Sequence, residues 1–255
     1  MLLVLMPLLL LVTPSPPPAL PSVFTPPPIL MYHRVDSSRP ADAVGRQLTV
    51  SPEHFGEQLT YLKECGLTPI SMAEMERRLE QHQTLDRTVV ITFDDGYADQ
   101  YDYALPLLRA QNVDATFYIV TGEVGRRNHL TWPQLLAMAS MHMDLAAHGV
   151  QHDDLSLLTL QQQTFQITDS VQTIERELHT RVESYAYPSG RFNRETLRIV
   201  RDAGIPLAVT TDRSYVLAPE NRFEMTRLRV RGDWTLHDFA RALRHEMFVR
   251  HVVLR

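Results

Sequence analysis

From Ile29 onward, the pattern of hydrophobic and polar positions switches repeatedly between that of a strand and that of a helix. Short apolar runs predict strands, and longer segments with apolar residues every three or four positions predict helices. The run TVVITF (88–93) has no polar alternation after Thr88, so this strand is expected to be buried on both faces. The clearest helix starts at Ser51 as N-cap and stops at Gly66.

The order of these elements indicates the fold class. Strands and helices alternate, which implies an α/β protein with a parallel sheet. About seven strands over roughly 225 residues favour a single domain built on a barrel or barrel-like sheet. The predicted strands are 29–35, 88–93, 115–120, 143–148, 183–188, 206–211 and 225–230, and the predicted helices are 51–66, 71–80, 103–111, 131–140, 159–179, 194–204 and 235–248.

The first 28 residues do not follow this pattern. The apolar run MLLVLMPLLLLV precedes a proline-rich stretch, and no charged residue occurs before Arg34. The run is shorter than the roughly 20 residues of a membrane span and has about the length of a signal-peptide core. We therefore predict an exported protein of the cell envelope, periplasm or exterior, with residues 1–28 as a signal-like segment and linker outside the fold. Loose membrane association through this segment is a further expectation, and a disordered leader is the alternative.

Composition narrows the classes of function. Hydrophobic residues make up 44% and charged residues 22% of the chain, as in ordinary globular proteins. The formal net charge of −5 gives no electrostatic footprint for nucleic acid. Cys65 is the single cysteine, so no internal disulfide can form, and it is expected to be a structural residue at a helix end. Glycine-rich dinucleotide and nucleotide-triphosphate motifs are missing from the sequence.

Candidate chemistry follows four of the predicted strands. In parallel α/β folds, ligands bind at the carboxyl ends of the strands, so side chains placed there should share one mouth. The residues at these strand ends are His33, the pair Asp94 and Asp95, the pair His148 and His152, and the turn Pro188, Ser189 and Gly190.

The carboxylates and imidazoles together predict a catalytic metal site. Asp94 and Asp95 repel each other unless a cation offsets one charge. His148 and His152 can converge on one ion, and a single carboxylate completes a set of three ligands that leaves a position open for water. Neighbouring residues of an extended segment point to opposite sides, so one aspartate can bind the ion while the other acts as general base.

Three segments then carry a family resemblance. TFDDGY, HGVQHDDL and YAYPSG, in this order, resemble the polysaccharide deacetylases of carbohydrate esterase family 4, the NodB homology domain. LMYHRV, SPEHFGEQLTYLKECG and TRLRV…TLHDFARAL are similar to its poly-N-acetylglucosamine deacetylase branch. The resemblance covers about residues 29–248. It implies a distorted (β/α) barrel and a metal-dependent hydrolase that removes N-acetyl groups from an N-acetylglucosamine-containing polysaccharide and releases acetate.

The resemblance also implies a metal and its ligands. Asp94 matches the catalytic base, whereas Asp95, His148 and His152 match the ligands of one divalent ion. Zinc is the favoured ion, with cobalt, nickel or iron(II) as alternatives.

The remaining candidate residues match substrate-handling positions of the family. The turn Pro188–Gly190 matches the loop whose backbone N–H, here that of Ser189, helps to hold the oxyanion. His33 matches the imidazole that this branch uses as general acid. Tyr97 is a candidate for substrate contact, although packing is the simpler interpretation.

Three departures from the family pattern stand out. Gly149 replaces the usual serine or threonine, and Ala186 replaces an arginine that pairs with the catalytic aspartate. We hypothesise that Arg227 takes over this pairing. The acidic aromatic motif of many members is not evident in TTDRSYV (210–216).

Other functions fit the sequence less well. A non-catalytic saccharide-binding domain on the same fold would not need an intact set of Asp94, Asp95, His148 and His152. An iron oxygenase with two histidines and one carboxylate usually has an all-β fold. A glycosidase needs two carboxyls roughly 5–9.5 Å apart, normally from different segments.

Overall fold

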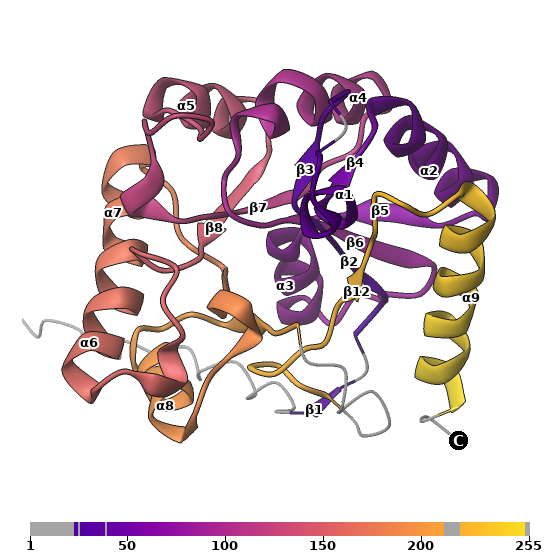
Figure 1. The fold of residues 1–255 in the computed structure, drawn as a ribbon. Coiled ribbons are helices and arrows are strands. Elements are labelled where there is room, and N and C mark those ends of the chain that lie inside the picture. Colours follow the sequence, from indigo (N-terminus) through magenta and orange to yellow (C-terminus); the bar gives the residue numbers. More distant parts are fainter. Residues whose placement is uncertain (1–22, 25, 39, 212–219, 253–255) are drawn as a thin grey trace, which may run out of the picture.

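A computed structural model of the chain describes residues 23–24, 26–38, 40–211 and 220–252. A curved parallel sheet lies at its centre, and helices pack around the outside (Figure 1). Within the described ranges, no helix combines the length and apolar character needed to span a membrane.

Seven parallel strands form the sheet, and an eighth, β5 (Thr68–Ile70), pairs with the first half of β6. At the end of β10, Val209 forms a bridge with Met225, three residues before β12, so the two edges of the sheet approach each other. The α/β class and the distorted (β/α) barrel in a single domain are thereby confirmed. Across the sheet, the strands run in the order β10 (Leu207–Val209), β9 (Ser184–Ala186), β8 (Asp144–Ala147), β7 (Thr116–Ile119), β6 (Thr88–Phe93), β2 (Ile29–Tyr32) and β12 (Leu228–Arg229).

Side chains alternate along each strand between the barrel interior and the outer helices. In β6, Val90 belongs to a small inner core to which residues of seven strands contribute, whereas Ile91 and Phe93 belong to the large outer core. All six residues of β6 are buried, which confirms the prediction of a strand covered on both faces.

The helix α3 (Met72–Glu80) closes the amino-terminal end of the barrel. Met72 and Met75 belong to the inner core together with Val90. Ser71 caps this helix by accepting a hydrogen bond from the backbone N–H of Glu74 at 3.1 Å. The opposite end, where the strands deliver their carboxyl termini, stays available for chemistry.

The outer helices agree with the predicted segments, except that no helix was predicted at residues 43–48. The predicted helix 159–179 is continuous but contains a π-helical turn, η4 (Phe165–Asp169), and a second π-helical turn, η1 (Gln100–Ala104), leads into α4. The helices are α1 (Ala43–Leu48), α2 (Pro52–Glu64), α4 (Leu105–Ala110), α5 (Trp132–Ser140), α6 (Leu160–Thr164), α7 (Ser170–Leu178), α8 (Arg194–Asp202) and α9 (Leu236–Val252). Short 3₁₀ turns occur at η2 (Thr121–Glu123), η3 (Leu155–Leu157) and η5 (Pro188–Gly190).

The predicted first strand, 29–35, is shorter in the structure. Strand β2 ends at Tyr32, and β3 (Arg34–Val35) leaves the sheet to pair with β4 (Thr49–Val50). The Asp99 carboxylate stabilises the position of β3 outside the sheet, because it accepts a hydrogen bond from the Val35 N–H at 3.0 Å. His33 therefore lies at the break between the two strands, at the mouth of the barrel.

The amino-terminal boundary also differs from the expectation of a linker outside the fold. Strand β1 (Val23–Phe24) pairs with β11 (Glu220–Asn221), and the Pro28 carbonyl accepts a hydrogen bond from Val90 N at 2.9 Å. Contacts with the fold thus begin ahead of Ile29. The signal-like apolar run lies outside the described residues.

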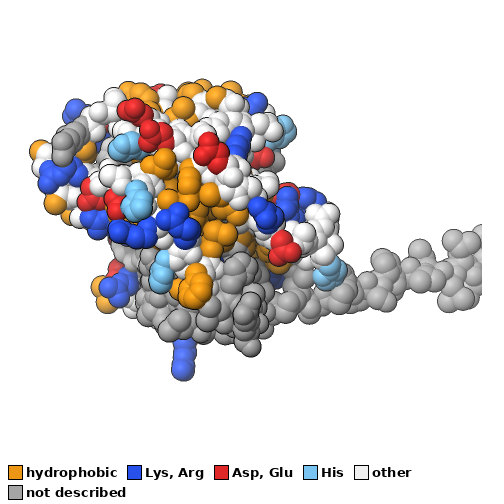
Figure 2. Space-filling view, turned by 90° about the vertical axis from the view of Figure 1, so that its right-hand side faces the viewer, with side chains coloured by type: hydrophobic (Ala, Val, Ile, Leu, Met, Phe, Trp, Pro, Cys, Tyr) orange, Lys and Arg blue, Asp and Glu red, His pale blue; other side chains and the backbone are white. Residues whose placement is uncertain are grey.

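Figure 2 shows the face that includes α9. Apolar side chains gather near its middle, and acidic and basic side chains are interspersed around them. On α9, Phe248 is exposed. Among the side chains coloured on this face, neither sign of charge forms one continuous patch.

We predict that Met75→Ala lowers the free energy of unfolding by about 2–5 kcal/mol, because Met75 is fully buried where α3 closes the barrel. Denaturant unfolding measures the change. Leu136→Ala, at a side chain that is 45% exposed, is the control and should change stability far less. Equal losses in the two variants would contradict the assignment of α3 as the barrel closure.

Candidate active site and metal centre

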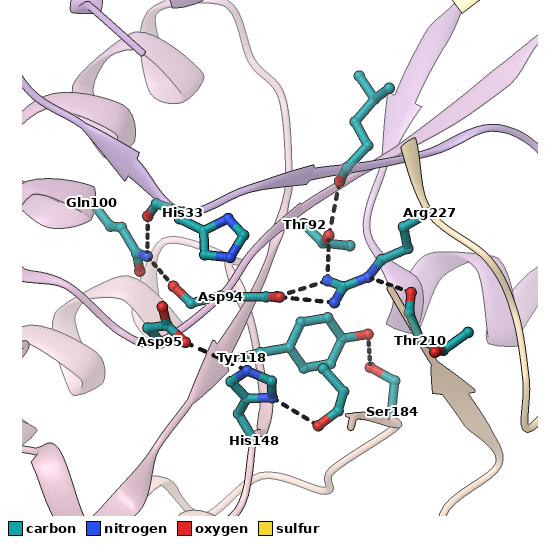
Figure 3. Close-up of polar contacts among 12 residues, drawn as sticks. His33, Thr92, Asp94, Asp95, Gln100, Tyr118, His148, Ser184, Thr210 and Arg227 are labelled. Atoms are coloured by element: carbon teal, nitrogen blue, oxygen red, sulfur yellow. Dashed lines mark hydrogen bonds and ion pairs between the residues drawn. The ribbon is translucent and has the colours of Figure 1, made fainter. Parts of the chain in front are cut away.

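The carboxyl ends of the strands bring the predicted site residues together. His33 follows β2, Asp94 and Asp95 follow β6, and His148 follows β8 (Figure 3). These side chains converge from strands that are far apart in the sequence, as expected at the mouth of a parallel barrel.

Asp94 and Arg227 form a buried, two-pronged ion pair. The guanidinium Nη1 and Nη2 donate to Asp94 Oδ1 and Oδ2 at 2.6 and 2.8 Å, and the side chains are 2% and 0% exposed. Arg227 also donates to Thr92 Oγ1 at 3.1 Å and to the Thr210 carbonyl at 3.4 Å (Figure 3). The hypothesised contact between Arg227 and Asp94 is therefore present, on a chain that has Ala186 in the usual arginine position.

The charge of Asp94 follows from these neighbours. Burial alone would raise its pKa, but the Arg227 guanidinium and the nearby His148 imidazole hold the pKa of this carboxyl below its usual value. Asp94 is therefore ionised at neutral pH, as a general base must be. Each carboxylate oxygen accepts one N–H of Arg227 and retains a further lone pair for a proton.

Asp95, His148 and His152 form a donor set that fits a metal ion. One ligand atom from each lies within 4.8 Å of the others, and Asp95 Oδ1 is 3.5 Å from Nε2 of both imidazoles. The His148 Nδ1 is 2.7 Å from the Ala186 carbonyl, which leaves its Nε2 directed at Asp95. Such a contact between a histidine and a backbone carbonyl orients a metal-binding imidazole. The two imidazole nitrogens and one carboxylate oxygen are ligands that suit zinc or a similar ion.

Left-handed backbone shapes the segments that carry these ligands. Asp95 and Gly96 have φ values of 73° and 71°, and Gly149 and His152 have φ values of 81° and 57°. The sequence predicted that the carboxylates of Asp94 and Asp95 diverge because they lie in an extended segment. In the structure they diverge because the backbone turns at Asp95. Non-glycine residues in this region carry strain that the surrounding structure must hold, and they are concentrated at functional sites.

His33 lies beside Asp94 in the same mouth (Figure 3). Its Nδ1 is buried without a hydrogen-bond partner within the described part of the chain. Burial lowers the pKa of this imidazole, while the charges of Asp94 and Asp95 act in the opposite direction. The structure thus places His33 within reach of the reacting groups, and its role as acid stays a prediction.

Two glutamines of the site were not found by the sequence analysis. Gln100 donates through Nε2 to the carbonyls of His33 at 2.7 Å and Asp94 at 2.6 Å, and so ties two strand ends together. Gln166 instead accepts, through Oε1, two backbone N–H groups of the loop that carries His152. Both occupy π-helical turns, which have no recognisable sequence pattern.

Tyr97 packs at the rim of the metal centre. Its ring stacks on His129 with centroids 5.1 Å apart, and the Arg34 guanidinium lies 5.0 Å from its centroid. Asp99 holds Arg34 at 2.7 Å. Burial and the Asp95 charge raise the pKa of Tyr97 to about 12, so its hydroxyl stays protonated. Packing is confirmed, and contact with substrate stays a prediction.

The predicted oxyanion turn, η5, adopts a fixed shape. Ser189 has a φ of 55°, and its carbonyl accepts from Thr211 Oγ1 at 3.1 Å. The Gly190 carbonyl accepts from Thr210 Oγ1 at 2.9 Å, and a Cβ at Gly190 would collide with Thr211. The role of the Ser189 N–H stays a prediction. Of the segment TTDRSYV, residues 212–216 lie outside the described residues.

A buried carboxylate beside an Asp–His–His donor set at the mouth of a (β/α) barrel is the arrangement of a hydrolytic enzyme. A family model, polysaccharide deacetylase, matches residues 81–208. The chain belongs to the polysaccharide deacetylase family of hydrolases.

Individual relatives agree with this assignment. Over 204 residues, the chain is 31% identical to YxkH of Bacillus subtilis, which bears a provisional polysaccharide deacetylase name; the match covers 80% of this chain and 71% of YxkH. It is 25% identical to the poly-beta-1,6-N-acetyl-D-glucosamine N-deacetylase of Staphylococcus epidermidis, over 80% and 78% of the two chains. The structure of Streptococcus pyogenes deacetylase PplD in complex with acetate matches with a TM-score of 0.77 and 30% identity, over 85% and 97% of the two chains.

We predict that Arg227→Met destabilises the protein in a pH-dependent way. In the wild type the pKa of Asp94 lies below 3.8, so its stabilising effect is present above that pH and is lost as the pH falls further. Without the guanidinium, burial raises the pKa of Asp94, and the variant loses stability as the pH rises. The gap between the two proteins should therefore widen from about pH 4 to pH 8 and reach about 3–5 kcal/mol.

Unfolding by denaturant across this pH range measures the gap. The double variant D94N/R227M is the control, because it has no carboxylate to titrate at this position. A gap between wild type and R227M that is constant with pH would show that the guanidinium does not govern the charge of Asp94.

Proposed function

We propose that the protein is a metal-dependent deacetylase that removes N-acetyl groups from a polysaccharide containing N-acetylglucosamine and releases acetate. The observation that carries this proposal is the juxtaposition of an ionised, buried Asp94 with the donor set of Asp95, His148 and His152. Hydrolysis of an amide by an activated water needs a metal site with three protein ligands and, beside it, a base that does not bind the metal.

Asp95, His148 and His152 would hold one divalent ion, for which zinc is the favoured candidate. When bound there, the ion supplies Lewis acidity, which polarises the substrate carbonyl and lowers the pKa of a coordinated water. His148 contributes through Nε2, because its Nδ1 is engaged by the Ala186 carbonyl.

The chain's own residues then divide the proton transfers. Asp94 accepts the proton of the attacking water, and Arg227 holds its carboxylate in place for this step. His33 donates a proton to the departing amine as the C–N bond breaks, which leaves acetate and a free glucosamine unit. The N–H of Ser189 donates to the oxyanion, and losing one such donor typically costs about 2.7–4 kcal/mol.

The relatives support the choice of substrate. The Staphylococcus epidermidis relative is named for N-deacetylation of poly-beta-1,6-N-acetyl-D-glucosamine. Acetate, the product expected here, occupies the similar Streptococcus pyogenes structure. A polymer of this kind lies outside the cytoplasm, so we propose that the apolar start of the chain directs its export.

We predict that the zinc-loaded protein releases acetate from oligomers of β-1,6-linked N-acetylglucosamine. Asp94→Asn should abolish release and still bind zinc, whereas His148→Ala should lose both. Coupled enzymatic detection of acetate and calorimetric titration with zinc make the two measurements. Chelation should stop the reaction, and added zinc should restore it. If the wild type bound zinc but released no acetate from β-1,6-linked, chitin or peptidoglycan oligomers, two alternatives would be left: another acetylated substrate, or a saccharide-binding domain that keeps its ion.

We predict separately that His33→Ala lowers kcat by about 100- to 10,000-fold, the range of a general acid, with little change in zinc affinity. The alkaline limb of the pH–rate profile should disappear, because it reports the loss of the proton from His33. His129→Ala, at the stack on Tyr97, is the control and should keep the profile. Retention of the alkaline limb in His33→Ala would assign the acid to another group.

A further inference from the structure

The three metal-binding side chains are held in unequal ways. His148 is 2% exposed, and the Ala186 carbonyl fixes its ring. The side chain of His152 is 38% exposed and meets the edge of His148 with centroids 4.8 Å apart. The position of the His152 ring therefore depends mainly on the conformation of its own backbone.

The backbone of the short segment 149–152, which ends at His152, is strained. Gly149 and His152 both have left-handed φ values, at the two ends of the segment 149–152. The left-handed conformation costs a histidine free energy, so contacts with the rest of the molecule must hold His152 and its segment in place. On one edge, Thr121 N and Gly122 N donate to the carbonyls of Gly149 and Val150 at 3.1 and 2.8 Å.

On the other edge, a single side chain provides the contacts. Gln166 Oε1 accepts the backbone N–H groups of both Val150 and Gln151 at 2.9 Å. Its Nε2 donates to Gln151 Oε1 at 3.2 Å and to Asp153 Oδ2 at 3.0 Å. All four contacts reach residues 150–153, which include the metal ligand.

The position of Gln166 follows from the π-helical turn η4. This turn widens the helix between α6 and α7 at residues 165–169, and Gln166 there is 3% exposed. π-Helical turns of this kind occur often at functional sites, where they displace a side chain from its usual helical position.

We propose that Gln166 is a positioning residue that holds His152 in its ligand geometry and thereby sets the metal affinity of the site. The inference rests on the proposed function in that it takes Asp95, His148 and His152 as the ligands. Gln166 itself touches neither the ion nor the substrate. It acts by fixing the two backbone amides that precede His152.

The helix provides a matched control. Gln163 lies three residues earlier and is 2% exposed, and it also uses both ends of its amide, toward the Leu158 carbonyl and Thr196 Oγ1. Replacing it removes buried hydrogen bonds of the same kind from the same helical segment, but none from residues 149–153. A general loss of stability is therefore expected in variants of both Gln163 and Gln166. A change in the position of residues 149–153 is expected only in variants of Gln166.

The experiment is calorimetric titration of the metal-free full chain with zinc. Gln166→Leu should weaken zinc binding by about 10- to 100-fold, the usual effect of removing a group that orients a ligand. Gln163→Leu should bind zinc as tightly as the wild type, even if its unfolding midpoint falls as far. Gln166→Glu retains an acceptor for both amides but loses the donor to Asp153, so its zinc affinity should lie between those of Gln166→Leu and the wild type.

Wild-type zinc affinity in Gln166→Leu would overturn the proposal, and so would an equal loss of affinity in Gln163→Leu. Because the titration needs no substrate, its outcome is separate from that of the acetate assay. Zinc binding that depends on Gln166 in a protein that releases no acetate would refute the proposed activity and leave the positioning role intact.

Discussion

The buried ion pair of Asp94 and Arg227 is the constraint that organises the barrel interior. An aspartate inside an apolar barrel would take up a proton unless a cation compensated it, and a neutral acid is no base. The guanidinium itself needs acceptors, which Thr92 and Thr210 provide from neighbouring positions. The Thr92 hydroxyl and the Thr210 carbonyl thus support the buried charge of Asp94, while Val90 and the methionines of α3 belong to the apolar interior.

Around this pair, the site combines rigid and strained parts. His148 is packed and oriented by a backbone carbonyl, whereas Asp95, His152 and Ser189 occupy left-handed conformations at the ends of turns. Strain of this kind persists only where neighbouring groups hold it. Gln100 and Gln166 supply that support from behind the reacting groups, each through contacts with main-chain atoms. The shape of the site therefore depends on side chains that lie behind the proposed reacting groups.

Much of this arrangement could be predicted from the sequence, because strand ends are visible in it. Asp94 follows an apolar run, and the carboxyl ends of parallel strands share one mouth, so the convergence with His148 followed from topology. The pairing of Arg227 with Asp94 was hypothesised because Ala186 occupies the position where many family members have an arginine. Gln100 and Gln166 could not be found, since π-helical turns look like ordinary helix in the sequence. The break at His33 was hidden for a similar reason: ILMYHRV has the composition of one uninterrupted strand, and only Asp99, distant in sequence, draws its second half away.

The pairing of β2 with β12 has a consequence for how the protein matures. His33 lies near the start of the folded chain and Arg227 near its end, yet both face Asp94. During synthesis the proposed metal ligands have all been made once His152 is added, but the Gln166 side chain, the Ala186 carbonyl and the Arg227 guanidinium that hold the site are added later. A chain that ends before residue 227 therefore lacks the ion-pair partner of Asp94. The proposed site is in this sense complete only when segments from near the two ends of the described chain lie side by side.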